Sequence, residues 1–150
     1  MENRDDLVVF DKYNFKYKAQ ADPSLFDIDL KIKKGEKIVI VGPSGSGKST
    51  LAKSLNGQIP NTFPGDIEGS CLVDGKNLQN SSIFDLSLSV GTVLQDTDGQ
   101  FVGLTVAEDI AFSLENDNVD QEEMKKIVRK WADELGLINL LDMKPGELSG

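Results

Sequence analysis

The sequence contains no histidine and a single cysteine, Cys71. The absence of histidine excludes imidazole metal sites and a histidine general base within these 150 residues. One cysteine cannot form an intramolecular disulfide, so the fold is stabilised without one. Positive charge is also scarce, because 16 Lys and Arg stand against 25 Asp and Glu, a formal net charge of −9. A nucleic-acid surface needs a basic face to replace phosphate counterions, so we expect no nucleic-acid partner.

Long hydrophobic runs are missing as well. Runs such as Ile38-Val39-Ile40-Val41 are far too short to cross a bilayer. The first six residues are polar and acidic, and no signal-peptide core follows them. Hydrophobic residues make up 39% and charged residues 27%, as in folded soluble domains. A chain of 150 residues suits one domain that buries about 70% of its unfolded surface, and we expect it to be soluble and cytosolic.

The N-terminal third has the pattern of β-strands. Apolar residues fill positions 7–10 and alternate with polar residues in positions 13–17 and 26–33. In the last of these segments we expect one buried face, formed by Phe26, Ile28, Leu30 and Ile32. After Lys37, the next four residues are all apolar and β-branched. This indicates that residues 37–41 form a strand buried on both faces, as in a parallel sheet.

Helices and short strands are expected in the remainder. Residues 48–56 predict a helix with Leu51, Ala52 and Leu55 on one face, followed by a loop over residues 58–69. Residues 70–73 and 90–94 predict strands, and residues 96–103 a polar loop.

The last third predicts two helices. Thr105 and Glu108 form a capping box, and Asp120 opens a second helix whose apolar stripe includes Trp131 and which ends at Gly136. We expect Trp131 and Cys71 in the core. The whole pattern predicts a mixed α/β fold.

A glycine-rich segment carries the chemistry. Gly42-Pro43-Ser44-Gly45-Ser46-Gly47-Lys48-Ser49 matches the phosphate-loop pattern G-x-x-x-x-G-K-[ST] at every fixed position. In such a loop, glycines let successive N–H groups point at phosphate oxygens, the lysine supplies a mobile cation, and the serine hydroxyl can ligate Mg²⁺. The alternative is a chance glycine-rich turn. The predicted strand before the loop and helix after it favour nucleotide binding.

Further segments resemble the ATP-binding subunits of ABC transporters. Residues 41–51, which include Thr50, are similar to that family's phosphate loop, and Val93-Leu94-Gln95-Asp96 is similar to its Q-loop. Leu148-Ser149-Gly150 resembles the opening of its LSGGQ signature. Lys48 precedes Gln95 by 47 positions and Ser149 by 101, in the family's order. The resemblance implies a P-loop NTPase fold of the ABC ATPase type, with an N-terminal antiparallel β part and a helical subdomain.

The resemblance also implies roles for individual residues. ATP and Mg²⁺ are the implied cofactors, Lys48 and Gln95 the catalytic residues, and Ser49 and Gln95 the metal ligands. The nucleotide-binding set comprises Tyr17, Gly42, Pro43, Ser44, Gly45, Ser46, Gly47, Lys48, Ser49, Thr50, Ser149 and Gly150. Within this set Ser149 and Gly150 serve the nucleotide of a second ATP-binding domain, in a homo- or heterodimer.

Tyr17 matches the family's aromatic residue that stacks on adenine. Such stacking stabilises nucleic-acid bases by roughly 1–3 kcal/mol. The alternatives are that Tyr17 is a core aromatic residue, or that Tyr13 or Phe15 is the stacking residue instead.

Five short segments resemble the energy-coupling-factor importers of vitamins and metal ions: residues 56–60, 63–65, 69–75, 95–101 and 105–112. In that group the loop from Gln95 to Thr105 faces a membrane coupling protein, and a substrate-binding membrane protein completes the complex. This implies a peripheral location at the cytoplasmic face of the cell membrane. The alternative for the loop is a solvated connection.

The family's second acidic motif and its switch histidine are not found in these residues. We therefore expect an incomplete ABC ATP-binding domain that lacks the C-terminal part of the core, with residues 1–95 forming the β part and phosphate-loop core. Residues 96–150 then hold the Q-loop region and helical subdomain up to the start of the signature. The parent is expected to be a translocase-coupled ATPase, and the 150 residues alone inactive. A soluble ABC ATPase of translation or DNA repair and a non-catalytic nucleotide-binding fragment are the alternatives.

Overall fold

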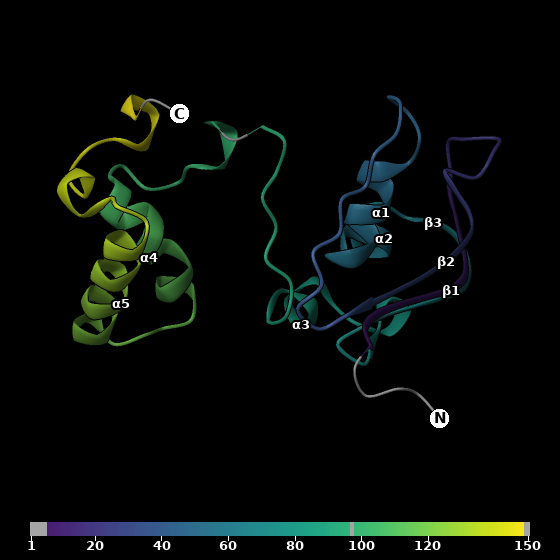
Figure 1. Ribbon diagram of the computed structural model, residues 1–150, viewed down its shortest axis with the longest axis horizontal. Helices are drawn as coiled ribbons and strands as arrows, with labels where there is room; N and C mark the ends of the chain where they lie inside the picture. The colour runs from purple at the N-terminus through teal and green to yellow at the C-terminus, as the bar shows by residue number, and fades with distance from the viewer. Residues whose placement is uncertain (1–5, 97, 149–150) are drawn as a thin grey trace. The chain divides into compact units, whose positions relative to one another are not determined.

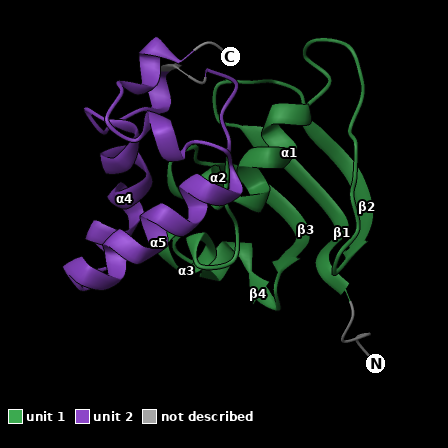
Figure 2. Cartoon of the chain, turned by 60° about the vertical axis from the view of Figure 1, so that its left-hand side comes forward, with its two compact units in different colours: residues 1–92 green, residues 93–150 purple. Residues whose placement is uncertain are grey.

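The computed structural model describes residues 6–96 and 98–148. The chain divides into two compact units, residues 1–92 and residues 93–150, coloured separately in Figure 2. None of the helices in the described ranges is long and apolar enough to cross a membrane.

The first unit is built on an antiparallel sheet in the order β2-β1-β3-β4. Its strands are β1 (Asp6–Tyr17), β2 (Leu25–Lys33), β3 (Gly65–Val73) and β4 (Lys76–Asn77). The two segments expected at 7–10 and 13–17 form the single strand β1. A bulge lies between them, because Lys12 has a φ of 45° and the pairing register shifts between Phe10 and Tyr13. The buried positions consequently change from even to odd numbers along β1.

A second bulge lies in β2 and makes one expectation wrong. Ile28, Leu30 and Ile32 pack against the core as expected, but Phe26 is 74% exposed and Leu25 is buried in its place. Asp27 has a φ of 48°. Between the pairs Phe15–Leu25 and Tyr13–Ile28, β2 advances by three residues while β1 advances by two. The extra residue reverses the alternation.

Side chains satisfy the backbone at both bulges. The N–H of Lys12 donates to Asp29 Oδ1 at 2.9 Å, and the N–H of Asp27 donates to Asn14 Oδ1 at 2.9 Å. At each bulge a side chain thus supplies the hydrogen bond that the regular ladder does not form there. One of these bonds runs from β1 to a side chain of β2, and the other from β2 to a side chain of β1.

Two helices lie against one face of this sheet (Figure 1): α1 (Lys48–Leu55) and α2 (Gln58–Asn61). Gly57, with a φ of 76°, follows α1 as expected. The expected apolar stripe is partly wrong, because Ala52 is exposed and the fully buried position is Ser54. The core between sheet and helices contains Phe10, Tyr13, Phe15, Leu51, Ile59, Cys71, Leu78 and Leu86.

Cys71 is fully buried in β3, as expected. Burial raises the pKa of its thiol from 9.0 to about 12, because the thiolate is poorly solvated there. Cys71 therefore acts as a small apolar residue.

Short helical segments surround these elements. α3 (Ile83–Ser87) begins with a capping box in which Ser82 and Asp85 bind each other's backbone N–H. Hydrogen bonds from Ser82 lower the pKa of Asp85. The 3₁₀ turns are Leu78–Asn80 in the first unit and Asp98–Gln100, Ile138–Leu140 and Pro145–Glu147 in the second.

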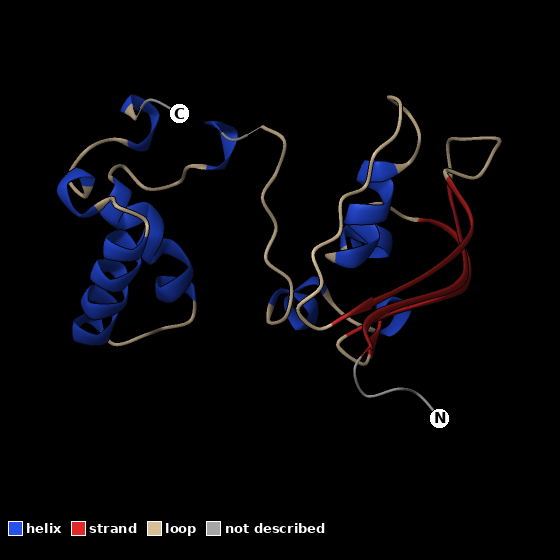
Figure 3. Ribbon diagram, viewed as in Figure 1, coloured by secondary structure: helices blue, strands red, loops and turns tan. Residues whose placement is uncertain are grey.

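Three expectations about regular structure are wrong. Residues 37–41 and 90–94 are loops rather than strands (Figure 3), and the expected loop at 58–69 contains α2 and the start of β3. Val39 and Val41 are more than 80% exposed, as is Val93. A strand needs a hydrogen-bonding partner, and within the described ranges no strand pairs with either segment.

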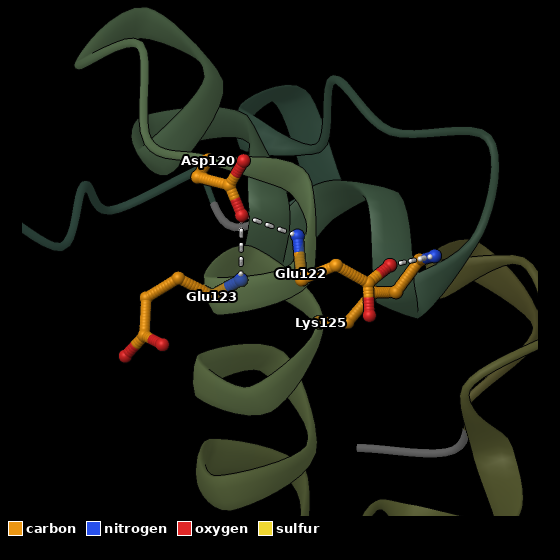
Figure 4. A network of polar contacts seen from close by, with 4 residues as sticks. All are labelled: Asp120, Glu122, Glu123 and Lys125. Carbon is orange, nitrogen blue, oxygen red and sulfur yellow. Dashed lines mark hydrogen bonds and ion pairs between the residues drawn. The ribbon is translucent and has the colours of Figure 1, made fainter.

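The second unit consists mainly of α4 (Val106–Asn116) and α5 (Gln121–Glu134), with the expected capping box at Thr105 and Glu108. Asp120 caps α5 by accepting from the N–H groups of Glu122 and Glu123, as Figure 4 shows. Gly136, with a φ of 71°, follows the helix. Trp131 is 47% exposed, so its assignment to the core is wrong, and Val128 and Ala132 form the buried stripe of α5.

Candidate functional site

The phosphate loop is an exposed turn that leads directly into α1. Gly45 and Gly47 have φ values of 80° and 88°, a conformation that glycine adopts without steric cost. Gly47 is the N-cap of α1, and Lys48 and Ser49 are its first two residues. The loop therefore has the geometry that places several N–H groups at a helix N-terminus.

The backbone donors of this loop suit an anionic ligand. The N–H of Ser46 donates to the Pro43 carbonyl at 3.3 Å. For Gly45, Gly47, Lys48 and Ser49, no acceptor for the N–H is found within the described ranges. Unpaired N–H groups beside the positive end of a helix dipole fit the phosphate oxygens of a nucleotide.

Lys48 adds the cation that the motif predicts. Its Nζ lies 2.9 Å from the Gly42 carbonyl, 2.8 Å from the Pro43 carbonyl and 3.4 Å from Ser46 Oγ. The ammonium thus crosses the loop and holds it closed through neutral acceptors. Phosphate oxygens accept more strongly than carbonyls, so the same ammonium can exchange them for a phosphate.

Close packing requires glycine at Gly47, where backbone blocks a side chain, whereas at Gly42 the blocking atom is a hydroxyl that can rotate away. A Cβ on Gly42 would lie 2.7 Å from Ser46 Oγ, and a Cβ on Gly47 would lie 2.6 Å from the Ser24 carbonyl oxygen and 3.1 Å from Leu25 Cδ2. A Cβ on Gly45 would meet no atom within 4 Å. Gly47 therefore brings the helix start against the beginning of β2, while Gly45 serves only the backbone conformation.

Ser49 is exposed at the second position of α1, where its hydroxyl can serve as a hard oxygen ligand for Mg²⁺. Within residues 6–96 and 98–148, no group of three or more Cys, Asp or Glu side chains gathers into a metal site. Ser49 with the oxygens of a nucleotide is thus the donor set that these residues offer, and its role as a ligand stays a prediction.

Tyr17 lies beside the helix that carries the phosphate loop. Its hydroxyl is 3.3 Å from the hydroxyl of Thr50 in α1. Its ring meets Phe15 edge-on at 4.7 Å between centroids and Phe63 at 6.4 Å. Tyr13 and Phe15 are fully buried, whereas Tyr17 is only partly buried and retains surface for a ligand. The stacking role of Tyr17 stays a prediction.

The hydroxyls of α1 fix the helix to β1. Thr50 and Ser54 are its buried polar residues, and Tyr13 binds Ser54 across 3.1 Å. Ser54 also donates to the Thr50 carbonyl at 3.2 Å. Burial raises the pKa of Tyr13 to about 12, and the Ser54 hydrogen bond opposes this shift.

Sequence reasoning missed Ser54, and it missed Phe63, whose ring packs against Tyr17 and lies 3.9 Å from Lys53 Nζ. Helical spacing from Thr50 could have found Ser54. The sequence contains no local signal for Phe63.

Gln95 is exposed in the second unit, in a loop that Gln100 holds. Gln100 Oε1 accepts from the N–H of Leu94 at 2.9 Å, and its Nε2 donates to the carbonyls of Leu94 and Asp96. Gln100 thus binds the chain on both sides of Gln95, a role that sequence reasoning missed. The phosphate loop belongs to the first unit, so the role of Gln95 stays a prediction. Ser149 and Gly150 lie outside the described residues.

Comparisons with known proteins agree on one family. The family model described as ABC transporter matches residues 25–150. Two relatives that bear the name ABC transporter ATP-binding protein come from Enterococcus faecalis and Streptococcus mutans. They are 59% and 56% identical over 144 residues, 96% of this chain. A solved structure, cbiO1 from Clostridium perfringens, described as part of the ABC transporter complex cbiONQ, is 31% identical over 97% of this chain with a TM-score of 0.83.

The chain spans only part of the proteins that it matches. It covers 25% of the Enterococcus relative, 26% of the Streptococcus relative and 56% of the cbiO1 chain.

Proposed function

Because this chain belongs to the ABC transporter family of ATP-binding proteins, we propose that it binds Mg²⁺–ATP at residues 42–50 and serves solute uptake. The family and the ABC ATPase fold expected from the sequence are confirmed. The finer assignments, an energy-coupling-factor importer with Mg²⁺ as cofactor and a second ATP-binding domain as partner, belong to the proposal.

The single observation that carries the proposal is the donor set of the phosphate loop. Gly45, Gly47, Lys48 and Ser49 lie in one turn, where their N–H groups have no acceptor among the described residues and the Lys48 ammonium binds only neutral acceptors. Phosphoryl transfer to water requires positioning and stabilisation of phosphate charge, which such donors provide before the reaction begins. Mg²⁺, when bound, would neutralise charge on the β- and γ-phosphates, and the Ser49 hydroxyl is the protein ligand that we propose for it.

The remaining predicted residues complete this proposal. Tyr17 would stack on the base, and Thr50 holds Tyr17 through its hydroxyl. Gln95 would contribute to catalysis from the loop of the second unit, and Ser149 and Gly150 would serve the nucleotide of a second ATP-binding domain. When nucleotide binds, the Lys48 ammonium would leave the carbonyls of Gly42 and Pro43 and bind a phosphate instead, which would open the loop.

The importer assignment draws on the similarity to cbiO1, which is described as part of the ABC transporter complex cbiONQ. We propose that this chain likewise binds membrane proteins, at the cytoplasmic face of the membrane. Residues 101–104 expose apolar side chains in the loop that we propose as the contact.

Replacement of Lys48 by alanine in the full-length protein tests the nucleotide assignment. Loss of hydrogen bonds to a charged ligand costs about 1.5–3 kcal/mol, so ATP affinity should fall roughly 10- to 100-fold. Titration with a fluorescent ATP analogue measures this, with Lys34→Ala in the exposed turn after β2 as control. Equal affinities in the two variants would refute the phosphate-loop assignment.

A further inference from the structure

The first turn of α4 and the loop before it form a continuously hydrogen-bonded stretch. Every amide N–H from Val102 to Asp109 has an acceptor. Two of these acceptors are the carboxylates of Glu108 and Asp109, and two others are backbone carbonyls from a distant part of the chain. A loop in which consecutive N–H groups are all satisfied opens rarely, since opening would lose several bonds together.

The two carboxylates hold the loop that precedes α4. Asp109 Oδ1 accepts from the N–H of Val102 at 2.8 Å and from that of Gly103 at 3.0 Å. Glu108 Oε2 accepts from the N–H of Leu104 at 2.9 Å and from that of Thr105 at 3.2 Å. Hydrogen bonds to ionised acceptors are stronger than neutral ones, so each carboxylate fixes two residues of the loop.

Gly103 permits this arrangement. A Cβ on Gly103 would lie 2.2 Å from the backbone nitrogen of Asp109 and 2.8 Å from the carbonyl carbon of Glu108. The loop therefore lies directly against the first turn of α4, and a side chain at this position would force the two apart.

The same loop presents apolar side chains to solvent. Phe101 is 44% exposed, Val102 60% and Leu104 78%. The carboxylates hold the backbone N–H groups of Val102 and Leu104, while the side chains of these residues are largely exposed. A surface loop fixed in this way loses little conformational entropy when a partner covers it.

The other side of the α4 turn binds the segment that leads to the signature. The N–H of Val106 donates to the Met143 carbonyl at 2.9 Å, and that of Ala107 donates to the Leu141 carbonyl at 2.9 Å. From there the chain continues through the 3₁₀ turn Pro145–Glu147, with Pro145 buried and the N–H of Leu148 bound to the Pro145 carbonyl at 3.1 Å. One helical turn thus joins residues 101–105 to residues 141–148.

We propose that Glu108 and Asp109 are positioning residues, which fix the apolar loop 101–105 to the α4 turn and so link a partner bound at that loop to the segment ending at Leu148. This rests on the proposed function, in which the loop meets a membrane protein and the signature meets nucleotide. Displacement of the loop then moves the α4 turn, and the two carbonyls bound to that turn carry residues 141–148 with it.

Hydrogen exchange of the full-length protein tests the linkage without reference to transport. In Asp109→Ala, exchange at Val102 and Gly103 should rise about tenfold or more, and exchange at Glu147 and Leu148 should rise as well. Asp109→Asn retains an acceptor and should show a smaller rise at all four amides. Asp117→Asn, at the other end of α4, is the control and should change none of them. A rise confined to Val102 and Gly103 would overturn the linkage, and no rise at all would overturn the positioning role.

ATP hydrolysis tests the connection to coupling. In Asp109→Ala, hydrolysis by the full-length protein alone should be unchanged, whereas the additional hydrolysis seen after assembly with its membrane proteins should fall about tenfold, and in Asp109→Asn this fall should be smaller. Stimulation equal to that of the unmodified protein would refute a coupling role for Asp109. If the unmodified protein is not stimulated by membrane proteins at all, the proposed function fails, while the exchange experiment still decides the positioning role.

Discussion

Alanine at Gly47 should destabilise the first unit more than alanine at Gly45, although the two glycines belong to the same loop. Both have positive φ values, 88° and 80°, so each substitution places an L-residue in the left-handed region at a cost of about 1–2 kcal/mol. At Gly45 nothing else is added, since no atom lies within 4 Å of the new Cβ.

Gly47 carries a second penalty. Its Cβ would lie 2.6 Å from the Ser24 carbonyl oxygen, a backbone atom at the start of β2 that cannot rotate away. Overpacking of this kind costs about 1–3 kcal/mol more. We therefore expect about 2–5 kcal/mol for Gly47→Ala and about 1–2 kcal/mol for Gly45→Ala.

Native-state hydrogen exchange of the full-length protein measures the difference. The amides of the β1–β2 ladder and of Ser24, which donates to the Phe15 carbonyl at 2.8 Å, report the local free energy of opening. Each 1.4 kcal/mol appears as a tenfold faster exchange. If the two variants accelerate exchange equally, the contact between the phosphate loop and β2 contributes nothing, and the reasoning fails.

Two further predictions concern Tyr17 and Cys71. Tyr17→Ala should weaken ATP binding roughly 5- to 100-fold without weakening tripolyphosphate binding, because stacking on a base contributes about 1–3 kcal/mol. Calorimetric titration with both ligands checks this, and equal weakening would make Tyr17 a structural residue that acts through Thr50. Cys71 should react with iodoacetamide at pH 8 about 1,000-fold more slowly in the native protein than after denaturation in urea, since burial raises its pKa from 9.0 to about 12. Fast labelling of the native protein, followed by mass spectrometry, would show that β3 opens readily.

Local signals in the sequence predicted local structure well. The phosphate-loop pattern, the capping boxes and the glycines after helices each depend on residues within a few positions of one another. Thr105 and Glu108 bind each other's backbone as expected, and Gly57 and Gly136 have the positive φ expected of them. Such features need no distant partner, so spacing alone identifies them.

Features that depend on distant partners were not predicted. Residues 37–41 have strand composition but no paired strand in the described part of the chain, and composition cannot supply a partner. Phe26 is exposed because Asp27 is an extra residue relative to β1, and an alternating pattern does not reveal a bulge. In the site, Phe63 reaches Tyr17 from another part of the chain, and nothing near either residue indicates the contact.

The two tyrosines of β1 have a consequence for how the proposed base contact and the phosphate loop are held relative to each other. Tyr13 binds Ser54 and Tyr17 binds Thr50, so one strand holds α1 at two positions a single turn apart. The helix that begins at Lys48 can neither slide nor rotate against that strand without breaking one of these hydrogen bonds, of which the Tyr13–Ser54 bond is buried. With the proposed contacts, the fold therefore keeps the base-stacking ring of Tyr17 in a fixed place relative to the start of α1. Differences in length among the phosphate chains of ligands would be taken up by the long side chain of Lys48, which can reach a β- or a γ-phosphate.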